Sequence, residues 1–287
     1  MSAAEWGVTL IVVAAIGRAG LRKWAGHQRR WRPSEWAAGV GLELTPHNLE
    51  FVRSYIRRTR TLRIAGGLTG LVAPFAYSAY AGEPPPAPFD FSPITGLGGY
   101  LVGGVLAEVL VRRAKPESPT ALLVPRDLRD YLPSFHTISL RATSAAALCL
   151  FLLYLVVAKD AAIDRADALP PPTVMVPMIL LILLGVELLQ RYIVRRPQPA
   201  VQSDLLDADD AVRSASVHAL AGAGIALELL IVSVEIMGIG VVSDIQVVRW
   251  TLPWIALLCL GVSLGAWMDL TQPRHWKVRH AQQPARP

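Results

Sequence analysis

Seven long apolar segments divide this chain, and they constrain its fold more than any other feature. A helix needs about 20 mostly apolar residues to cross the hydrocarbon core of a bilayer. Inside lipid the backbone must satisfy its own hydrogen bonds, so only helices and closed barrels can span it. Uninterrupted apolar runs lack the alternating pattern of a barrel strand. The sequence therefore predicts an all-α, polytopic transmembrane helical bundle, with helices at residues 6–21, 62–81, 94–111, 142–158, 174–194, 217–242 and 251–270.

The composition agrees with lipid as the main solvent. Charged residues make up 17% of the chain and hydrophobic residues 53%, whereas soluble domains contain about 25% charged residues. The net charge of +6 could suit nucleic acid, but the basic residues lie between apolar segments, where membrane topology accounts for them. We therefore expect a single membrane domain, residues 1–287, without a nucleic-acid partner.

The basic residues also predict how the helices are oriented. With the N-terminus outside and the C-terminus cytoplasmic, the inner stretches contain 25 Lys and Arg residues and the outer stretches contain three. Loops rich in Lys and Arg stay cytoplasmic during insertion, so this split favours the stated orientation. The inner stretches are residues 18–63, 112–141, 191–213 and 274–286.

The N-terminal segment lacks the charge order of a cleavable signal peptide, which begins with positive charge. Here Glu5 precedes the apolar run, and Arg18, Arg22 and Lys23 follow it. We expect a retained helix at residues 6–21. Arginine outnumbers lysine by 24 to four, a bias typical of high-GC bacterial genomes, so the expected location is a bacterial plasma (inner) membrane that the chain crosses several times.

The first inner stretch contains an amphipathic pattern at residues 47–62. Its apolar side chains lie near one helical face, and four arginines occupy the remainder. One interpretation is a basic helix that lies on anionic lipid at the cytoplasmic face. The other is a cytoplasmic extension of the second membrane helix that anchors its topology. The four basic residues are Arg53, Arg57, Arg58 and Arg60.

A weak internal repeat of about 80 residues is also visible. Both the third and the fifth apolar segments end in V-R-R-x-x-P, at Val111 and Val194. The pattern predicts three parallel two-helix units, residues 41–118, 120–200 and 201–280, with Asn48, Asp127 and Asp207 as helix N-caps. The alternative is that arginine-flanked hairpins resemble one another through topology alone.

Two carboxylates on the sixth segment are the strongest candidates for a functional site. An ionisable side chain inside a membrane helix costs roughly 2.5–3.5 kcal/mol on insertion scales and suggests a function. Glu228 and Glu235 are seven residues apart, so two helical turns place them on one face. Their own segment offers no cation, so we expect a partner from another helix, a water-filled cavity or a bound cation. The alternative role is hydrogen bonding between helices.

Two further carboxylates lie nearer the predicted cytoplasmic surface. Glu108 precedes Arg112 by four residues, and Glu187 precedes Arg191 by the same spacing. Side chains four residues apart face each other on a helix, so local ion pairs are expected at both positions. Both glutamates nevertheless remain candidates as intramembrane polar residues, with Glu187 a possible neighbour of the first pair.

Motifs for common chemistries are absent from the sequence. There is no phosphate-binding G-x-x-x-x-G-K-[ST], no H-E-x-x-H and no Cys/His cluster, so we predict no catalytic residue, metal ligand or cofactor. Gly261-Val-Ser263-Leu-Gly265 matches the hydrolase G-x-S-x-G, but it lies inside an apolar segment, whereas that motif needs a strand-to-helix turn. We expect such glycine pairs to pack helices closely, including Gly66/Gly70 and Gly99/Gly103. Both cysteines, Cys149 and Cys259, are expected to pack as small hydrophobic residues.

Three functional hypotheses follow. The first is a transport or channel-like component that uses Glu228 and Glu235 for a proton or an ion. The second is a non-catalytic membrane subunit or scaffold whose inner loops dock a membrane or cytosolic partner, or each other. The third, an intramembrane enzyme, would need a nucleophile and a base within hydrogen-bond range. The acidic loop invoked by the second hypothesis contains Asp204, Asp207, Asp209 and Asp210.

Overall fold

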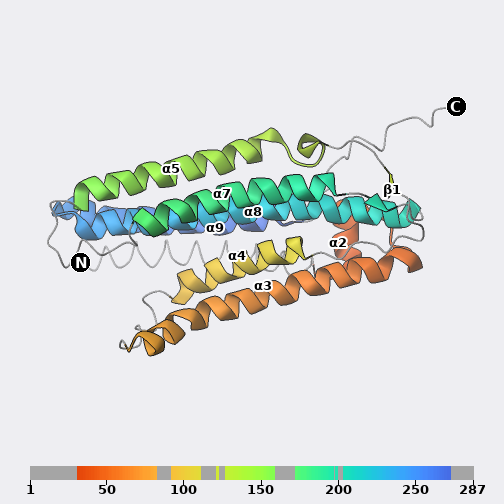
Figure 1. The fold of residues 1–287 in the computed structure, drawn as a ribbon, viewed down its shortest axis with the longest axis horizontal. Helices are drawn as coiled ribbons and strands as arrows, with labels where there is room; N and C mark the ends of the chain where they lie inside the picture. The colour runs from red at the N-terminus through yellow and green to blue at the C-terminus, as the bar shows by residue number, and fades with distance from the viewer. Residues whose placement is uncertain are drawn as a thin grey trace, which may run out of the picture.

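The computed structural model describes residues 31–82, 92–110, 121–122, 127–158, 172–196, 198–199 and 203–272. This part of the chain is almost entirely helical (Figure 1), as predicted. The predicted segment at residues 6–21 lies outside it. The α-helices are α2 (Pro33–Val40), α3 (Pro46–Ala81), α4 (Ser92–Val109), α5 (Ser134–Ala158), α7 (Pro172–Arg195), α8 (Ser203–Val242) and α9 (Gln246–Leu270).

Two minor elements accompany the helices at one end of the bundle. A short 3-10 helix, η1, spans Leu128–Asp130 and precedes α5. Strands β1 (Ala121–Leu122) and β2 (Gln198–Pro199) form a two-residue antiparallel pair. The strand pair connects the chain before the α5–α7 hairpin with the chain after it.

Four described helices are long and apolar enough to cross a membrane: α5, α7, α8 and α9. The apolar part of α4, Ile94–Val109, is shorter. The outer surfaces agree with a lipid environment, because large apolar side chains such as Leu181, Val156 and Leu258 are exposed there. Cys149 lies on this exposed surface and Cys259 is half-buried, so the prediction that both cysteines are packed inside is wrong for Cys149.

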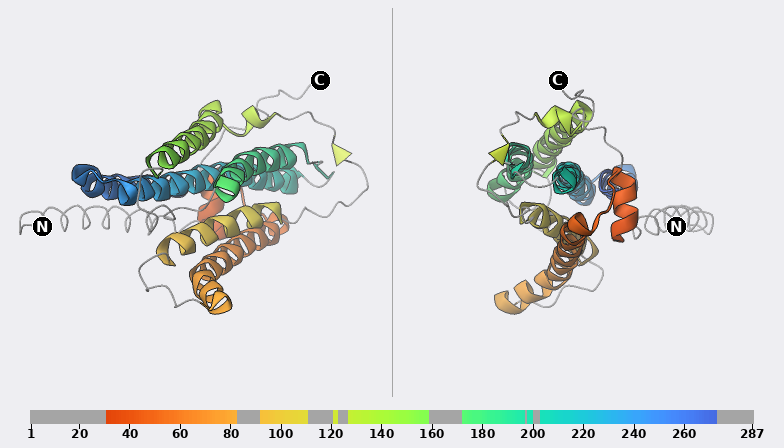
Figure 2. Two further views of the ribbon diagram at one scale, coloured as in Figure 1. Left: turned by 60° about the vertical axis from the view of Figure 1, so that its left-hand side comes forward. Right: turned by 90° about the vertical axis from the view of Figure 1, so that its right-hand side faces the viewer.

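Helix α8 is the axis of the bundle. The apolar window of α8 is 72% buried, whereas that of α9 is 11% buried. The end-on view shows the other helices arranged around it (Figure 2, right). Small residues let neighbours approach: a Cβ atom added at Gly222 would lie 2.9 Å from the Cβ atom of Leu270. Because most of its circumference faces protein, most side chains of α8 contact other helices.

Successive helices run in opposite directions, as an up-and-down bundle requires. The first residues of α3, α5 and α8 lie at the same end as the last residues of α4, α7 and α9 (Figure 1). We call this the polar end, because the charged extensions of α3 and α8 lie there. That the polar end faces the cytoplasm stays a prediction. Three contacts with α8 fix the arrangement: Thr45–Asp204, Glu108–Ser216 and Gly222–Leu270.

Glycines bring α3 and α4 into close contact, as predicted. A Cβ atom at Gly66 would lie 2.9 Å from the Cα atom of Gly103 and closer still to the carbonyl oxygen of Gly99. A Cβ atom at Gly70 would meet the carbonyl of Thr95. Real side chains do not tolerate such distances, so this hairpin depends on the absence of Cβ atoms. Gly261 differs, since its added Cβ atom would meet nothing within 4 Å, and its predicted packing role is wrong.

The amphipathic stretch at residues 47–62 forms the first half of α3 without a break. Its apolar face is buried against α2 and the start of α8, through Val52, Tyr55 and Ile56. The basic side is outward: Arg53, Arg57 and Arg60 are exposed, and Arg58 is half-buried. Of the two interpretations, the geometry therefore favours a helical extension, because the apolar face is covered by protein.

The predicted N-caps have mixed outcomes. Helix α3 begins with a capping box in which Thr45 is the N-cap and Asn48 is the third helical residue, so the prediction for Asn48 is wrong by three positions. Asp127 caps η1, as predicted. Asp207 lies inside α8, which starts at Ser203, so it is not a cap. The proposed three-fold repeat stays a prediction.

Candidate functional site: buried charges along α8

The charged groups in the bundle fall into two sets that differ in their partners. One set lies at the polar end, where arginines and carboxylates from several helices meet. The other consists of Glu228 and Glu235, deeper along α8. Burying a charge without compensation is costly, so the partners of each group indicate whether it stabilises the fold or remains available for another role.

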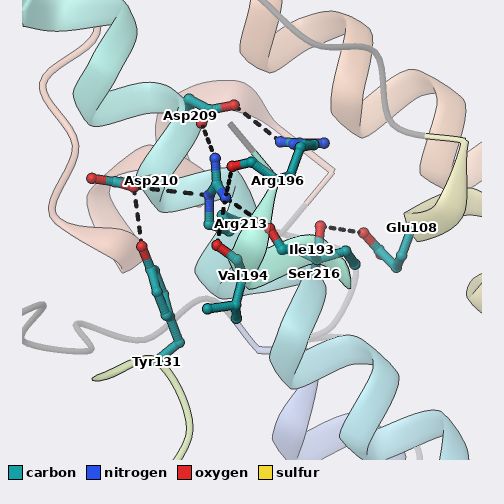
Figure 3. Close-up of polar contacts among 9 residues, drawn as sticks. All are labelled: Glu108, Tyr131, Ile193, Val194, Arg196, Asp209, Asp210, Arg213 and Ser216. Atoms are coloured by element: carbon teal, nitrogen blue, oxygen red, sulfur yellow. Dashed lines mark hydrogen bonds and ion pairs between the residues drawn. The ribbon is translucent and has the colours of Figure 1, made fainter. Parts of the chain in front are cut away.

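Arg213 fastens α7 to α8 at the polar end (Figure 3). Its side chain is fully buried, and one terminal nitrogen donates to the carbonyl oxygens of Ile193, Val194 and Arg196 at 2.7, 3.0 and 2.8 Å. The last carbonyls of a helix have no partner within it and carry partial negative charge. The guanidinium group therefore caps the C-terminus of α7.

Asp209 balances the charge of Arg213. It accepts a hydrogen bond of 2.9 Å from Arg213 and another of 3.1 Å from Arg196. Its neighbour Asp210 accepts from the hydroxyl of Tyr131 at 3.3 Å. We call Arg196, Asp209 and Arg213 the α7 clamp. Asp209 is buried within this clamp, so it is not available to dock a cytosolic partner.

Asp204 joins the start of α8 to the start of α3. It accepts a 2.5 Å hydrogen bond from the hydroxyl of Thr45, the residue that caps α3. The amide of Asn48 also donates to the backbone carbonyl of Asp204 at 3.4 Å. The acidic residues, predicted in a loop, thus lie in the first turns of α8 and contact the start of α3 directly. Contact between the two inner stretches is one of the arrangements that the scaffold hypothesis allowed.

Glu108 is the centre of a second buried cluster, formed by α3, α4 and α8. It accepts hydrogen bonds from Arg63 at 3.1 Å, Tyr55 at 3.2 Å and Ser216 at 2.7 Å. Burial and the negative charge of Glu108 raise the pKa of Tyr55, so its hydroxyl stays protonated and can donate. The guanidinium of Arg63 also lies over the ring of Trp267, 4.7 Å from its centroid, where a cation is attracted to the aromatic face.

The predicted local ion pairs have different outcomes. Glu187 does bind Arg191, at 3.0 Å, and it also binds Arg141 of α5 at 2.7 Å. For Glu108 the described cation is Arg63, 45 residues earlier in the chain, and Arg112 lies outside the described residues. The pattern of spacing therefore found the carboxylates but missed the partners that come from other helices.

Glu228 and Glu235 are completely buried on α8, and their surroundings provide little compensation. One oxygen of Glu228 contacts the hydroxyl of Ser144 on α5 at 2.9 Å, and the other has no hydrogen-bond partner. Neither carboxyl oxygen of Glu235 has one. Within the described residues neither glutamate forms an ion pair. In the part of the chain that the structure describes, three carboxyl oxygens are thus without hydrogen-bond partners inside an apolar bundle.

The contact with Ser144 indicates where a proton can sit. The hydroxyl of Ser144 lies 2.9 Å from Glu228 and 3.0 Å from the carbonyl oxygen of Leu140. A hydroxyl group has one proton to donate but can also accept. Both contacts are hydrogen bonds when Glu228 is protonated. The carboxyl O–H then donates a hydrogen bond to the hydroxyl oxygen of Ser144, and the hydroxyl of Ser144 donates to the carbonyl of Leu140. The geometry therefore suits a carboxylic acid at residue 228 that exchanges its proton.

Two serines of the sixth and seventh segments form hydrogen bonds between helices. Ser263 on α9 donates to the carbonyl of Ala226 at 2.7 Å, and Ser233 on α8 donates to the carbonyl of Ala256 at 2.8 Å. Ser263 lies within a continuous helix, not at a strand-to-helix turn. Its hydroxyl is engaged in packing, so the G-x-S-x-G match has a structural explanation.

The described residues contain no group of three or more His, Cys, Asp or Glu side chains suited to a metal ion. Comparisons of the chain with protein-family models, curated proteins and solved structures found no match. The functional argument therefore depends on the geometry of the bundle itself.

Proposed function

We propose that this chain is a multi-pass transport component of a bacterial plasma membrane, with its polar end in the cytoplasm. Glu228 and Glu235 form the site for the transported proton or small cation. The observation that carries this proposal is the burial of two carboxylates on the central helix without a described ion-pair partner. Such residues in membrane proteins mark ion pathways and proton relays.

The position of the two residues suits that role. Along a helix, Glu228 lies about 18 Å and Glu235 about 28 Å beyond Ser216, which bonds the Glu108 cluster. The pair is therefore inside the apolar part of α8, away from the charged extensions. Ser144 gives Glu228 a neighbour with which to share a proton. Because α8 is enclosed by other helices, the site is shielded from lipid.

Flux measurements in proteoliposomes test the proposal. The purified chain is reconstituted with a pH-sensitive dye inside, and a potassium diffusion potential drives proton movement; a second series follows sodium uptake. We expect flux from the native chain and at least a tenfold loss for Glu228→Gln and for Glu235→Gln, each with normal insertion. The matched control is Glu50→Gln, since Glu50 is exposed at the polar end. Unchanged flux in both buried variants, or no flux from the native chain, contradicts the proposal.

A membrane subunit or scaffold is the second candidate. The supporting observation is the row of outward basic residues on the extension of α3, whose opposite face is packed against α2 and α8. These residues, Arg53, Arg57, Arg58 and Arg60, suit contacts with anionic lipid or an acidic protein surface. Under this candidate Glu228 and Glu235 join helices, and neutral variants lose assembly and not flux. An intramembrane enzyme ranks third, since Ser263 is engaged in packing.

A further inference from the structure

A separate charged group lies on the outer surface of the bundle, between α5 and α7. Glu187 accepts hydrogen bonds from Arg141 at 2.7 Å and from Arg191 at 3.0 Å, so one carboxylate is shared by two arginines. The carboxylate is largely covered, whereas the arginine side chains are 58% and 50% exposed. The group therefore presents positive charge outward, with its negative member behind it.

Most of the donor groups of these two arginines remain available. A guanidinium has five N–H groups in a planar fork, and the contacts with Glu187 engage only Nε of Arg141 and one terminal nitrogen of Arg191. Arg195, one helical turn after Arg191, is exposed as well. With three cations and one carboxylate, the local charge favours an anion.

The surroundings of the arginines are apolar and face outward. On α5, Phe135 and Ile138 are 70% and 63% exposed, and both lie nearer the polar end than Arg141. On α7, Leu184 and Leu188 are exposed and lie farther from the polar end than Arg191, and Tyr192 is exposed beside Arg191. Exposed apolar side chains on both sides of the charges indicate that this surface contacts lipid. The guanidinium groups then lie near the level of the lipid headgroups.

We propose that Arg141 and Arg191 bind the phosphate group of an anionic phospholipid, whose acyl chains lie along α5 and α7. Arginine forms paired, charge-assisted hydrogen bonds with phosphate oxygens. Basic side chains between transmembrane helices near the cytoplasmic surface suit anionic headgroups. Glu187 holds the two guanidinium groups together, and the apolar surface next to them accommodates chains that a free phosphate ion lacks. This site is separate from Glu228 and Glu235, and it does not depend on transport.

Lipid titration of the purified full chain in detergent tests this site. Native mass spectrometry measures retention of dioleoyl-phosphatidylglycerol, with dioleoyl-phosphatidylcholine as the zwitterionic comparison, and inorganic phosphate is added as a competitor. The double variant Arg141→Gln/Arg191→Gln should bind phosphatidylglycerol roughly 30-fold less tightly, or about fivefold for each arginine. The control Arg32→Gln/Arg129→Gln removes the same charge from two exposed positions outside α5 and α7 and should retain most of the affinity.

Three results would overturn the proposal. They are native affinity in the double variant, equal retention of phosphatidylcholine, and displacement of the lipid by millimolar inorganic phosphate, which would indicate a site for a soluble anion. Should the glutamine variant fail to fold, Arg141→Lys/Arg191→Lys keeps the charge but loses the planar fork. We expect that variant to bind several-fold less tightly than the native chain, and equal affinity would contradict the paired geometry.

Discussion

The polar end and the middle of α8 both contain buried ionisable groups, but those at the polar end have charged and hydrogen-bonding partners and those in the middle of α8 have almost none among the described residues. At the polar end, Arg213 is held by Asp209 and by three carbonyl oxygens. In the middle of α8, neither oxygen of Glu235 has a hydrogen-bond partner among the described residues. A buried ion pair offsets its desolvation only when the geometry is good and the remaining donors are satisfied. The first region largely meets that condition, because among the described residues Arg213 lacks a hydrogen bond only at Nε, which lies 4.0 Å from Asp210. The second region does not meet it.

This difference is the basis for assigning the charged groups of the polar end to the stability of the fold and for proposing a function for Glu228 and Glu235. Groups in the α7 clamp and around Glu108 are tied to several helices, so a change in their charge would break the fold. Glu228 and Glu235 make one described hydrogen bond between them. Their charge can therefore change without the loss of a salt bridge, which is what a site that takes up and releases a proton or cation requires.

The largest expected effect is on the α7 clamp. Arg213→Ala leaves Asp209 buried beside a single arginine and removes the donor for three carbonyls at the end of α7. Removing one partner of a buried pair costs about 3–5 kcal/mol, and we expect the upper part of that range. Thermal unfolding in detergent, followed by tryptophan fluorescence, measures the loss. The control Arg60→Ala lies on the exposed side of α3 and should stay within about 0.5 kcal/mol of the native chain. Equal melting temperatures for Arg213→Ala and Arg60→Ala would contradict the idea that the α7 clamp stabilises the fold.

A smaller effect is expected at Arg63. Arg63→Ala removes the described cation beside Glu108 and the contact with Trp267, but Tyr55 and Ser216 still donate to the carboxylate. We therefore expect a loss of about 3 kcal/mol, at the lower end of the range for a broken buried pair. A double-mutant cycle with Glu108→Gln measures the coupling between the two side chains. If the stability losses of the two single variants add up to that of the double variant, Arg63 and Glu108 are not energetically coupled.

The smallest effect on stability is expected in the middle of α8. Glu235→Gln keeps the shape of the side chain and removes no described hydrogen bond or ion pair, so the free energy of unfolding should change by less than about 1 kcal/mol. The same melting assay measures it beside the Arg213 variant. A loss of stability as large as that of Arg63→Ala would mean that Glu235 has a structural partner. That result would contradict the proposed role of Glu235 in transport.

The sequence predicted the helices well because apolar runs and glycine spacing are local signals. Helix α4 was expected at residues 94–111 and spans Ser92–Val109. The close packing at Gly66/Gly70 and Gly99/Gly103 was expected from their four-residue spacing, and the structure adds that the two pairs pack against each other. Helices α3 and α8 begin 16 and 14 residues before their apolar segments, because amphipathic and charged turns can continue a helix beyond the lipid.

Contacts between distant segments were beyond the sequence. Arg213 and Asp209 are four residues apart, so their pairing could have been inferred from spacing. The three carbonyls that Arg213 caps lie at and just after the C-terminus of α7, and no local pattern identifies them. The partnership of Glu108 with Arg63 likewise depends on how α3 packs against α4. The burial of Glu228 and Glu235 was expected from their place in an apolar run, and their lack of described partners required the arrangement of all neighbouring helices.

The enclosed position of α8 has a consequence for biogenesis. Helices α3, α4, α5 and α7 leave the ribosome before it, so most of the surfaces that will surround α8 are synthesised before α8 itself. When α8 emerges, Ser144 and Glu108 are already present to receive its polar groups. Helix α9 comes afterwards, and its bonds to Ala226 and Ser233 close the remaining side. We therefore expect a nascent chain that stops before α9 to be recognised as unfinished by the cell's membrane proteases.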